Sequence, residues 1–261
     1  MTTDLITPRL VAEFRATLGD RLFTMPGNTA PLGLHWCLAS PLADTVDLRA
    51  DGHPPRVHPV SVADFPRRMW VGGGLDLVAP LQVGQTVIRT TTLLPTVMKS
   101  GVSGNWCLTG ADHDYTADGA LLVRERHDIA FRPASRGPVV TPPPQPLPDG
   151  DLVWEMATPE TLLFRYSALT FNGHRIHYDQ PYATRVEGYP GLVVHGPLQA
   201  TLLLNLAATL LGRAPAAFSY RATAPLIAGT AMVAIGRHRR DGVALSIHTP
   251  NDVMTMTATA S

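Results

Sequence analysis

The sequence predicts an α+β fold in which antiparallel sheet wraps around a largely enclosed helix, in two similar halves. Three observations predict it. An apolar helix is expected between Pro197 and Gly212, several strand-like segments follow it, and the first half of the chain repeats the strand pattern across a proline-rich segment. One helix followed by several antiparallel strands is typical of a sheet that curls around that helix.

The first half, residues 1–132, contains four strand-like segments. They cover residues 69–78, 85–94, 105–114 and 121–131. A counterpart of the long helix is not obvious there, and we interpret residues 31–40 as a short, degenerate version of it. We expect the half with the complete helix to carry the chemistry and the degenerate half to leave room for a ligand.

Residues 133–148 contain seven prolines, three of them consecutive at positions 142–144. This composition is typical of an extended, semi-rigid linker, here between residues 1–132 and 149–261. Each half contains a related hexapeptide followed by a strand-like run: Ala-Pro-Leu-Gln-Val-Gly at 79–84 and Ala-Pro-Leu-Ile-Ala-Gly at 224–229. Similar hexapeptides at corresponding places indicate an internal duplication.

The second half, residues 149–261, predicts the long helix. Pro197 suits the first turn of a helix and Gly212 the position just past its end. The leucines between them point in nearly all directions, so the helix is expected to be enclosed, with one polar stripe of Thr201, Asn205 and Thr209. Strands are predicted at residues 219–228, 230–237, 243–249 and 253–260, with a hairpin turn at Asp241-Gly242.

Composition excludes several classes of protein. Of the 261 residues, 45% are hydrophobic and 16% charged, and the 21 basic and 21 acidic residues balance, so nothing indicates binding to nucleic acid or to an anionic membrane. The two cysteines, Cys37 and Cys107, form no disulfide framework or zinc-finger spacing and predict buried thiols. With no signal-peptide pattern and no apolar run long enough to span a bilayer, we expect a cytoplasmic protein.

A dense polar segment lies at residues 165–179, in a chain that is otherwise poor in charge. It contains two histidines, an asparagine, an aspartate, a serine, a threonine and two tyrosines. The segment Gly-Leu-Val-Val-His-Gly-Pro at 191–197 then opens the apolar helix. A histidine-rich segment beside a helix N-terminus supplies acid–base groups and a site for negative charge, which favours an enzyme.

The same segments resemble the MaoC-type hydratase/dehydratase family of double hot-dog proteins. The resemblance covers residues 164–179, Tyr182-Ala183 and 187–197, and more weakly residues 68–73 and 124–129. It is strongest toward the mesaconyl-C4-CoA and itaconyl-CoA hydratases and the mitochondrial-type 3-hydroxyacyl-thioester dehydratases. It implies a double hot-dog fold, with two antiparallel sheets each wrapped around a helix and the N-terminal helix degenerate.

For activity, the resemblance implies reversible hydration of a short α,β-unsaturated acyl-CoA thioester. A C5 dicarboxylyl-CoA of the mesaconyl-C4-CoA or itaconyl-CoA type is the expected substrate, with no metal or other cofactor. The partner is then the acyl-CoA itself, and a homodimer is expected because hot-dog sheets commonly associate. Two other functions remain open: a hot-dog acyl-CoA thioesterase, and an acyl-thioester-binding protein without catalysis.

The broader family pattern Gly-Asp-x-Asn-Pro-hydrophobic-His implies the catalytic residues. Its histidine falls on His177, which we expect to perform acid–base work, and its aspartate position is Asn172. An amide cannot act as a base near neutral pH, so Asn172 is expected to hold the water or the thioester oxygen. His174 occupies the asparagine position and is expected to assist His177, orient the water or bind a substrate carboxylate.

Further residues are expected to bind the substrate. The Gly196 N–H at the helix start is the expected oxyanion donor, and His195 either lines that pocket or caps the helix. Tyr166 either packs or orients the site. Asp179 is either structural or fixes a histidine tautomer. Arg175, with Arg165 and Arg185 as alternatives, is a candidate for binding a distal carboxylate or the CoA phosphates.

Overall fold

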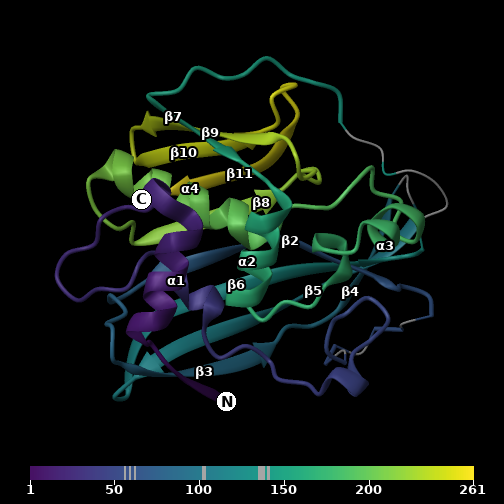
Figure 1. The fold of residues 1–261 in the computed structure, drawn as a ribbon, viewed down its shortest axis with the longest axis horizontal. Coiled ribbons are helices and arrows are strands. Elements are labelled where there is room, and N and C mark those ends of the chain that lie inside the picture. Colours follow the sequence, from purple (N-terminus) through teal and green to yellow (C-terminus); the bar gives the residue numbers. More distant parts are fainter. Residues whose placement is uncertain (56, 59, 62, 102–103, 135–138, 140–141) are drawn as a thin grey trace.

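The computed structural model describes residues 1–55, 57–58, 60–61, 63–101, 104–134, 139 and 142–261 (Figure 1). The strands are β1 Thr2–Leu5, β2 Arg67–Leu77, β3 Thr86–Leu93, β4 Val97–Gly101, β5 Gly104–Ala117, β6 Ala120–Arg132, β7 Leu152–Ala157, β8 Ala217–Ala222, β9 Ala231–Arg239, β10 Gly242–His248 and β11 Met254–Ala260. The α-helices are α1 Pro8–Leu18, α2 Glu160–Leu169, α3 Gln180–Arg185 and α4 Gly196–Leu211. Short 3-10 helices cover Gly19–Arg21, Leu34–Cys37, Thr45–Asp47 and Arg175–His177.

All strands belong to one antiparallel sheet. Its order is β1-β3-β5-β6-β2-β8-β11-β10-β9-β7, and β4 pairs with β5. Strands β1–β6 precede the predicted linker and β7–β11 follow it, so the two halves meet where β2 pairs with β8, from Gly72↔Arg221 to Asp76↔Ala217. The two sheets that the sequence predicts are therefore joined edge to edge, which the sequence analysis did not anticipate (Figure 1).

Helix α4 is enclosed, as predicted. It contacts β7–β11, and most of its residues from Leu198 to Ala208 are buried. Gly212 ends it in the left-handed conformation at φ 68°, which glycine adopts without steric cost. One residue of the polar stripe, Asn205, binds the first half of the chain. Its Oδ1 accepts from Phe23 N–H at 3.0 Å, and its Nδ2 donates to the Leu32 carbonyl at 3.2 Å. Asn205 thus holds the first half of the chain against the helix.

The degenerate helix of the first half is also confirmed. Residues Leu34–Cys37 form one buried 3-10 turn in the predicted segment 31–40. The two hexapeptides make corresponding contacts: Ala30 N–H donates to the Leu81 carbonyl and Val194 N–H to the Leu226 carbonyl, both at 2.8 Å. Their last residues, Gly84 and Gly229, have φ angles of 89° and 86°. The start of α4 therefore corresponds in position to the start of the degenerate turn.

Some boundaries differ from the predictions. Strand β8 ends at Ala222, because residues 224–229 form the hexapeptide turn instead of extending the strand. The hairpin after β9 has Arg240-Asp241 as its loop, since Arg239 pairs with Gly242, so the predicted turn is one residue late. The elements that were not predicted are β1, α1, β4, β7, α2 and α3.

The described part of the predicted linker forms no helix or strand; residues 135–138 and 140–141 lie outside the described residues. Val139 N–H donates to the Gly188 carbonyl, and Gln145 N–H to the Asp252 carbonyl. Cys37 and Cys107 are both buried, as expected. Within the described ranges, no helix is long and apolar enough to cross a membrane.

Candidate active site

The polar segment folds around the N-terminus of α4. Helix α2 carries Tyr166 and Ser167, the 3-10 turn Arg175–His177 carries His177, and α4 begins at Gly196. From the other half of the chain, the loop around His53 contacts His174, and Arg68 at the start of β2 contacts His53. Four imidazole rings lie in sequence across this junction, and we call His53, His174, His177 and His195 the histidine row.

His177 is held in one tautomer. Its Nδ1 lies 2.7 Å from the Val193 carbonyl oxygen, which can only accept, so Nδ1 carries the proton and Nε2 the lone pair. Nε2 has no hydrogen-bond partner among the described residues. Burial lowers the pKa of His177 to about 4, so the imidazole is neutral at pH 7. A neutral imidazole with a free lone pair is suited to deprotonating water.

His195 lies directly against His177. The two rings stack with centroids 3.6 Å apart and planes inclined by 16°. His195 Nε2 lies 2.7 Å from Ser167 Oγ, whereas Nδ1 is buried and has no partner among the described residues. His195 is the N-cap residue of α4: its carbonyl accepts from Gln199 N–H, and its side chain makes no capping hydrogen bond. Tyr166 is fully buried behind it, with its hydroxyl 3.3 Å from Thr201 Oγ1.

Gly196 is the first residue of α4, where the backbone N–H groups have no partner within the helix. The ring of Trp70, from β2, lies against its Cα. An ideal Cβ on Gly196 would be 2.8 Å from Trp70 Cζ3 and closer still to Cε3, so only glycine fits without displacement. The aromatic ring of the first half thus packs against the first turn of α4, at the positive end of the helix dipole.

His174 connects the two halves. Its ring is perpendicular to that of His177 at 5.4 Å and lies 4.1 Å from that of His53. Burial lowers the pKa of His174 well below its usual value. His53 Nε2 lies 3.2 Å from Arg68 Nη1, and His53 Nδ1 lies 3.4 Å from Asp51 Oδ2, the one carboxylate within 4 Å of a ring nitrogen of the row among the described residues. The row is therefore poor in negative charge.

Asn172 shapes the turn that carries His174. Its Oδ1 accepts from the His174 N–H at 3.0 Å, and its own N–H donates to the Ser167 carbonyl at 2.9 Å. This is the local side-chain turn that asparagine favours. Its acceptor oxygen is thus used by the backbone, and its Nδ2 is the group available for a ligand.

Arg175 and Asp179 are partners of each other. Arg175 donates through Nε and Nη2 to Asp179 Oδ2 at 2.9 and 2.7 Å, donates to the Ala50 carbonyl, and lies 4.2 Å above the Tyr182 ring. Asp179 Oδ1 also accepts from Tyr182 N–H at the start of α3. These contacts support the structural alternative for Asp179, and the tautomer of His177 is fixed by Val193 instead.

The sequence analysis did not identify His53, Arg68 and Trp70 as site residues. Arg68 and Trp70 lie in residues 68–73, which belong to the weaker part of the family resemblance and contain no histidine, aspartate or glutamate that would indicate catalysis. His53 lies in a loop far from the polar segment in sequence, and it reaches His174 only because the loop backbone is held there: Arg175 N–H donates to the Asp51 carbonyl at 2.9 Å.

A second polar cluster lies in the first half. His113, Glu125 and His127 are the described residues whose side chains could together hold a metal ion. Glu125 is fully buried and accepts from Tyr115 at 3.1 Å, from Trp36 and from His127, so its oxygens are satisfied by protein donors. The arrangement is that of a buried carboxylate stabilised by hydrogen bonds, and it adjoins the site through the Trp70 ring, which lies 5.9 Å from that of His127.

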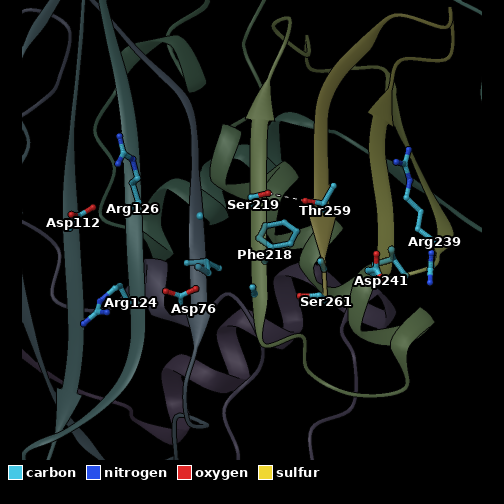
Figure 2. A pocket seen from close by; sticks show the side chains of 17 residues that line it. Asp76, Asp112, Arg124, Arg126, Phe218, Ser219, Arg239, Asp241, Thr259 and Ser261 are labelled. Atoms are coloured by element: carbon cyan, nitrogen blue, oxygen red, sulfur yellow. Dashed lines mark hydrogen bonds between the residues drawn. The ribbon is translucent and has the colours of Figure 1, made fainter.

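Two cavities lie away from the histidine row. One, of about 710 Å³, lies on the sheet face opposite the helices, where Asp76, Arg124, Ser219 and Thr259 line it (Figure 2). The other, of about 660 Å³, is lined by residues near 23–33 and by the C-terminal end of α4. Neither has a residue of the row in its lining, so neither carries the acid–base chemistry.

Comparison with known sequences finds a matching family and two relatives. The family described as hydroxyacyl-thioester dehydratase type 2 matches residues 33–228. Mesaconyl-C(4)-CoA hydratase of Chloroflexus aurantiacus is 38% identical over 227 residues, which is 86% of this chain and 81% of the relative. The mitochondrial hydroxyacyl-thioester dehydratase type 2 of Schizosaccharomyces pombe is 26% identical over 234 residues, 77% of each chain.

Comparison with solved structures confirms the double hot-dog fold. HtdX of Mycobacterium tuberculosis has a TM-score of 0.72 at 17% identity and covers 100% of this chain and 99% of its own. A MaoC-like dehydratase of Phytophthora capsici has a TM-score of 0.69 at 14% identity, with 99% and 94% covered. A second Mycobacterium tuberculosis protein, described as a double hot-dog fold, has a TM-score of 0.60 at 17% identity, with 99% and 92% covered.

Proposed function

This chain belongs to the hydroxyacyl-thioester dehydratase type 2 family, and from that premise we propose that it reversibly hydrates a short C5 dicarboxylyl-CoA of the mesaconyl-C4-CoA or itaconyl-CoA type. The chain is a hydro-lyase of the hydratase/dehydratase class that acts on acyl thioesters. The finer choice of substrate is supported by the 38% identity to mesaconyl-C(4)-CoA hydratase over most of both chains.

The observation that carries the proposal is the fixed tautomer of His177 beside the N-terminus of α4. His177 Nε2 takes a proton from water while the water oxygen bonds to the β-carbon. The electrons of the double bond move to the thioester oxygen, where the Gly196 N–H and the helix dipole stabilise the enolate. The protonated Nε2 then returns the proton to the α-carbon, so one water is added and the enzyme is regenerated.

The neighbouring groups support this cycle. His195 and His174 hold the His177 ring between them, so its lone pair keeps one direction. The low pKa of His177 keeps its base form present at neutral pH, and the negative charge that develops on the substrate stabilises the imidazolium as it forms. In this proposal Asn172 Nδ2 donates to the water or the thioester oxygen, the role expected from the sequence, which its use of Oδ1 for the His174 N–H supports.

The test is the loss of enoyl-thioester ultraviolet absorbance with crotonyl-, mesaconyl-C4- and itaconyl-CoA, with products identified by mass. We expect His177→Ala to lower the rate roughly 100-fold or more, as removal of a general base does. His238→Ala is the matched control, because His238 is exposed on β9, and it should retain full activity. Thiol release without hydration would instead establish a thioesterase, and binding without turnover an acyl-thioester-binding protein.

A further inference from the structure

Arg67 and Arg68 are neighbours on β2 with opposite surroundings. Arg67 Nε donates to Glu187 Oε2 at 2.8 Å, and its guanidinium lies above the Tyr189 ring. Arg68 has no carboxylate within ion-pair distance in the described part of the chain; its one hydrogen-bond contact there is His53 Nε2, at 3.2 Å. Two adjacent arginines thus differ in that one is neutralised by the protein and the other is not.

The contact of Arg68 with His53 shows which ring nitrogen of His53 carries the proton. A guanidinium can only donate, so His53 Nε2 accepts and its Nδ1 carries the proton, facing Asp51 Oδ2. His53 is therefore neutral and removes no positive charge. Asp51 is engaged by Arg49 Nε at 3.4 Å and by His53 N–H at 3.0 Å. The charge of Arg68 is left without a direct partner.

A cation in this position has an energetic cost. Arg68 is half-buried, and burial lowers the pKa of its guanidinium, with Arg49 acting in the same direction and Asp51 against them. A partly desolvated charge without a counter-ion is unfavourable, and proteins retain such a group where a ligand supplies the opposite charge. A carboxylate fits best, because the planar guanidinium presents paired donors to its two oxygens.

The position of Arg68 along the histidine row indicates which carboxylate. The oxyanion donor Gly196 and the base His177 lie at one end of the row, and Arg68 lies beyond His174 and His53 at the other. A thioester carbonyl at Gly196, with its reacting carbons at His177, directs the remainder of a short acyl chain toward His174. Arg68 contacts His53 and its charge also acts on His174, so it is the cation available to a carboxylate on that chain.

We propose that Arg68 binds the distal carboxylate of the acyl chain and so selects dicarboxylyl thioesters over monocarboxylic ones. This inference rests on the proposed function, and it moves the carboxylate site from the arginines that the sequence indicated. Arg175 is committed to Asp179, and Arg165 donates to the Ala16 carbonyl. Unlike Arg165 and Arg175, Arg68 lies in the first half of the chain, which the sequence analysis expected to leave room for the ligand.

The first experiment is a binding measurement that does not depend on turnover. Succinyl-CoA and butyryl-CoA differ by a terminal carboxylate or methyl group, and neither has a double bond to hydrate. By calorimetry, wild type should prefer succinyl-CoA by about 10-fold or more, since a charge-assisted bidentate pair is made only with it. Arg68→Gln should abolish that preference and leave butyryl-CoA affinity unchanged. Arg237→Gln, at an exposed arginine on β9, is the matched control and should keep the wild-type preference.

The second experiment measures turnover with mesaconyl-C4-CoA and 3-methylcrotonyl-CoA, in which a methyl group replaces the carboxylate. Arg68→Gln should lower kcat/KM for the diacid roughly 100-fold and change the other substrate by less than about 3-fold, as expected when one polar contact sets specificity. Arg68→Lys keeps the charge, serves as the variant that preserves folding, and should retain an intermediate preference.

The outcomes separate the two proposals. If wild type hydrates neither thioester yet prefers succinyl-CoA, the carboxylate site stands and the proposed reaction fails. If wild type hydrates mesaconyl-C4-CoA and Arg68→Gln weakens both acyl-CoA ligands equally, with unfolding unchanged, Arg68 binds the CoA phosphates or another shared part. That result would overturn the inference, as would a wild-type enzyme with no preference for the diacid.

Discussion

At the scale of single residues, the site is built from histidines that are neutral. Burial lowers the pKa of His53, His174, His177 and His195, and none of the last three has a carboxylate partner among the described residues. A row of neutral imidazoles supplies lone pairs without adding net charge to the site. It also makes the folded state sensitive to acid, because each ring is more readily protonated after unfolding.

The pH dependence of stability tests this property at His177. Its pKa is 6.5 when unfolded and about 4 when folded, so the unfolded chain binds the extra proton between these values. The contribution is fully present above pH 6.5 and is lost as the pH falls toward 4, amounting to about 3 kcal/mol for a shift of this size. His177→Gln should therefore show a smaller drop in the free energy of unfolding from pH 7 to pH 4, measured with urea.

His238→Gln provides the comparison for that experiment, because its exposed ring should leave the slope as in wild type. The histidines that face His177, namely His174 and His195, titrate in both proteins. The charge of His177 lowers the pKa of both, so its removal makes their own loss of stability in acid smaller and acts in the same direction as the expected effect. An identical slope in wild type and His177→Gln would mean that the His177 ring is not buried as described.

The sequence pointed to His177, His174, His195, Gly196 and Tyr166, and the structure brings these residues together at the start of α4. The local sequence pattern was enough to predict them, because all five lie within residues 166–196, between the polar segment and the start of α4. Arg175 also carried a plausible charge, but its partner Asp179 is four residues away and neutralises it. His53 and Arg68 could not be predicted, since only tertiary pairing brings them to the row.

At the scale of elements, strand β2 and helix α4 fit together through one glycine. Trp70 stacks on Tyr220 with ring centroids 4.7 Å apart and 26° between planes, and its face then rests on Gly196. The ring is therefore fixed from both sides. The first turn of α4 can approach β2 this closely because Gly196 has no side chain.

Gly196→Ala tests this contact. The new methyl group would overlap the Trp70 ring, so we expect a loss of about 1–3 kcal/mol in the free energy of unfolding, typical of overpacking, together with lower kcat/KM. Trp70→Leu should make room, so the double variant should be more stable than the sum of the single changes predicts. Thermal and urea unfolding measure the coupling.

Gly74→Ala, also on β2, is the control for that cycle. Its Cβ would lie 3.5 Å from the nearest atom, the Phe218 carbonyl oxygen, which is an ordinary contact. It should cost far less than Gly196→Ala. Additive effects of Gly196→Ala and Trp70→Leu would show that ring and glycine do not meet.

The long elements were predictable and the short ones were not. The strands β5, β6 and β9–β11 and the helix α4 have clear periodicity or clear end signals over many residues. Helix α1 was missed although Thr7 caps it and Val11, Phe14 and Leu18 form its buried face, because the same window is rich in charge. Strands β1, β4 and β7 span four to six residues and are stabilised by pairing with neighbours more than by their own pattern.

At the scale of the whole molecule, each half is incomplete without the other. We propose that residues 1–132 and 149–261 are duplicated units, on the evidence of the matched hexapeptide turns. Among the described residues, only the second unit has the full helix that corresponds to α4, and α4 contacts both units. The candidate active site follows the same division, with His177 and His195 from one unit and His53, Arg68 and Trp70 from the other. The homodimer expected from the sequence stays a prediction.

Asn205 on α4 tests how far the two units depend on each other. It is fully buried, and it satisfies both the Phe23 N–H and the Leu32 carbonyl of the first unit. Asn205→Leu leaves these backbone groups unpaired, so we expect a loss of about 2–4 kcal/mol in the free energy of unfolding. Because β2 and β8 still pair across the junction, unfolding should remain a single transition in calorimetry.

Thr209 gives the matched control for the polar stripe. Its Oγ1 donates only within α4, to the Asn205 carbonyl at 3.0 Å, and no contact with the first unit involves that hydroxyl among the described residues. Thr209→Val should therefore cost less than about 1 kcal/mol, the usual net value of one hydrogen bond. If both variants lose the same stability, the stripe serves the helix alone. If Asn205→Leu splits unfolding into two transitions, the sheet junction does not couple the units, and the site they share depends on α4.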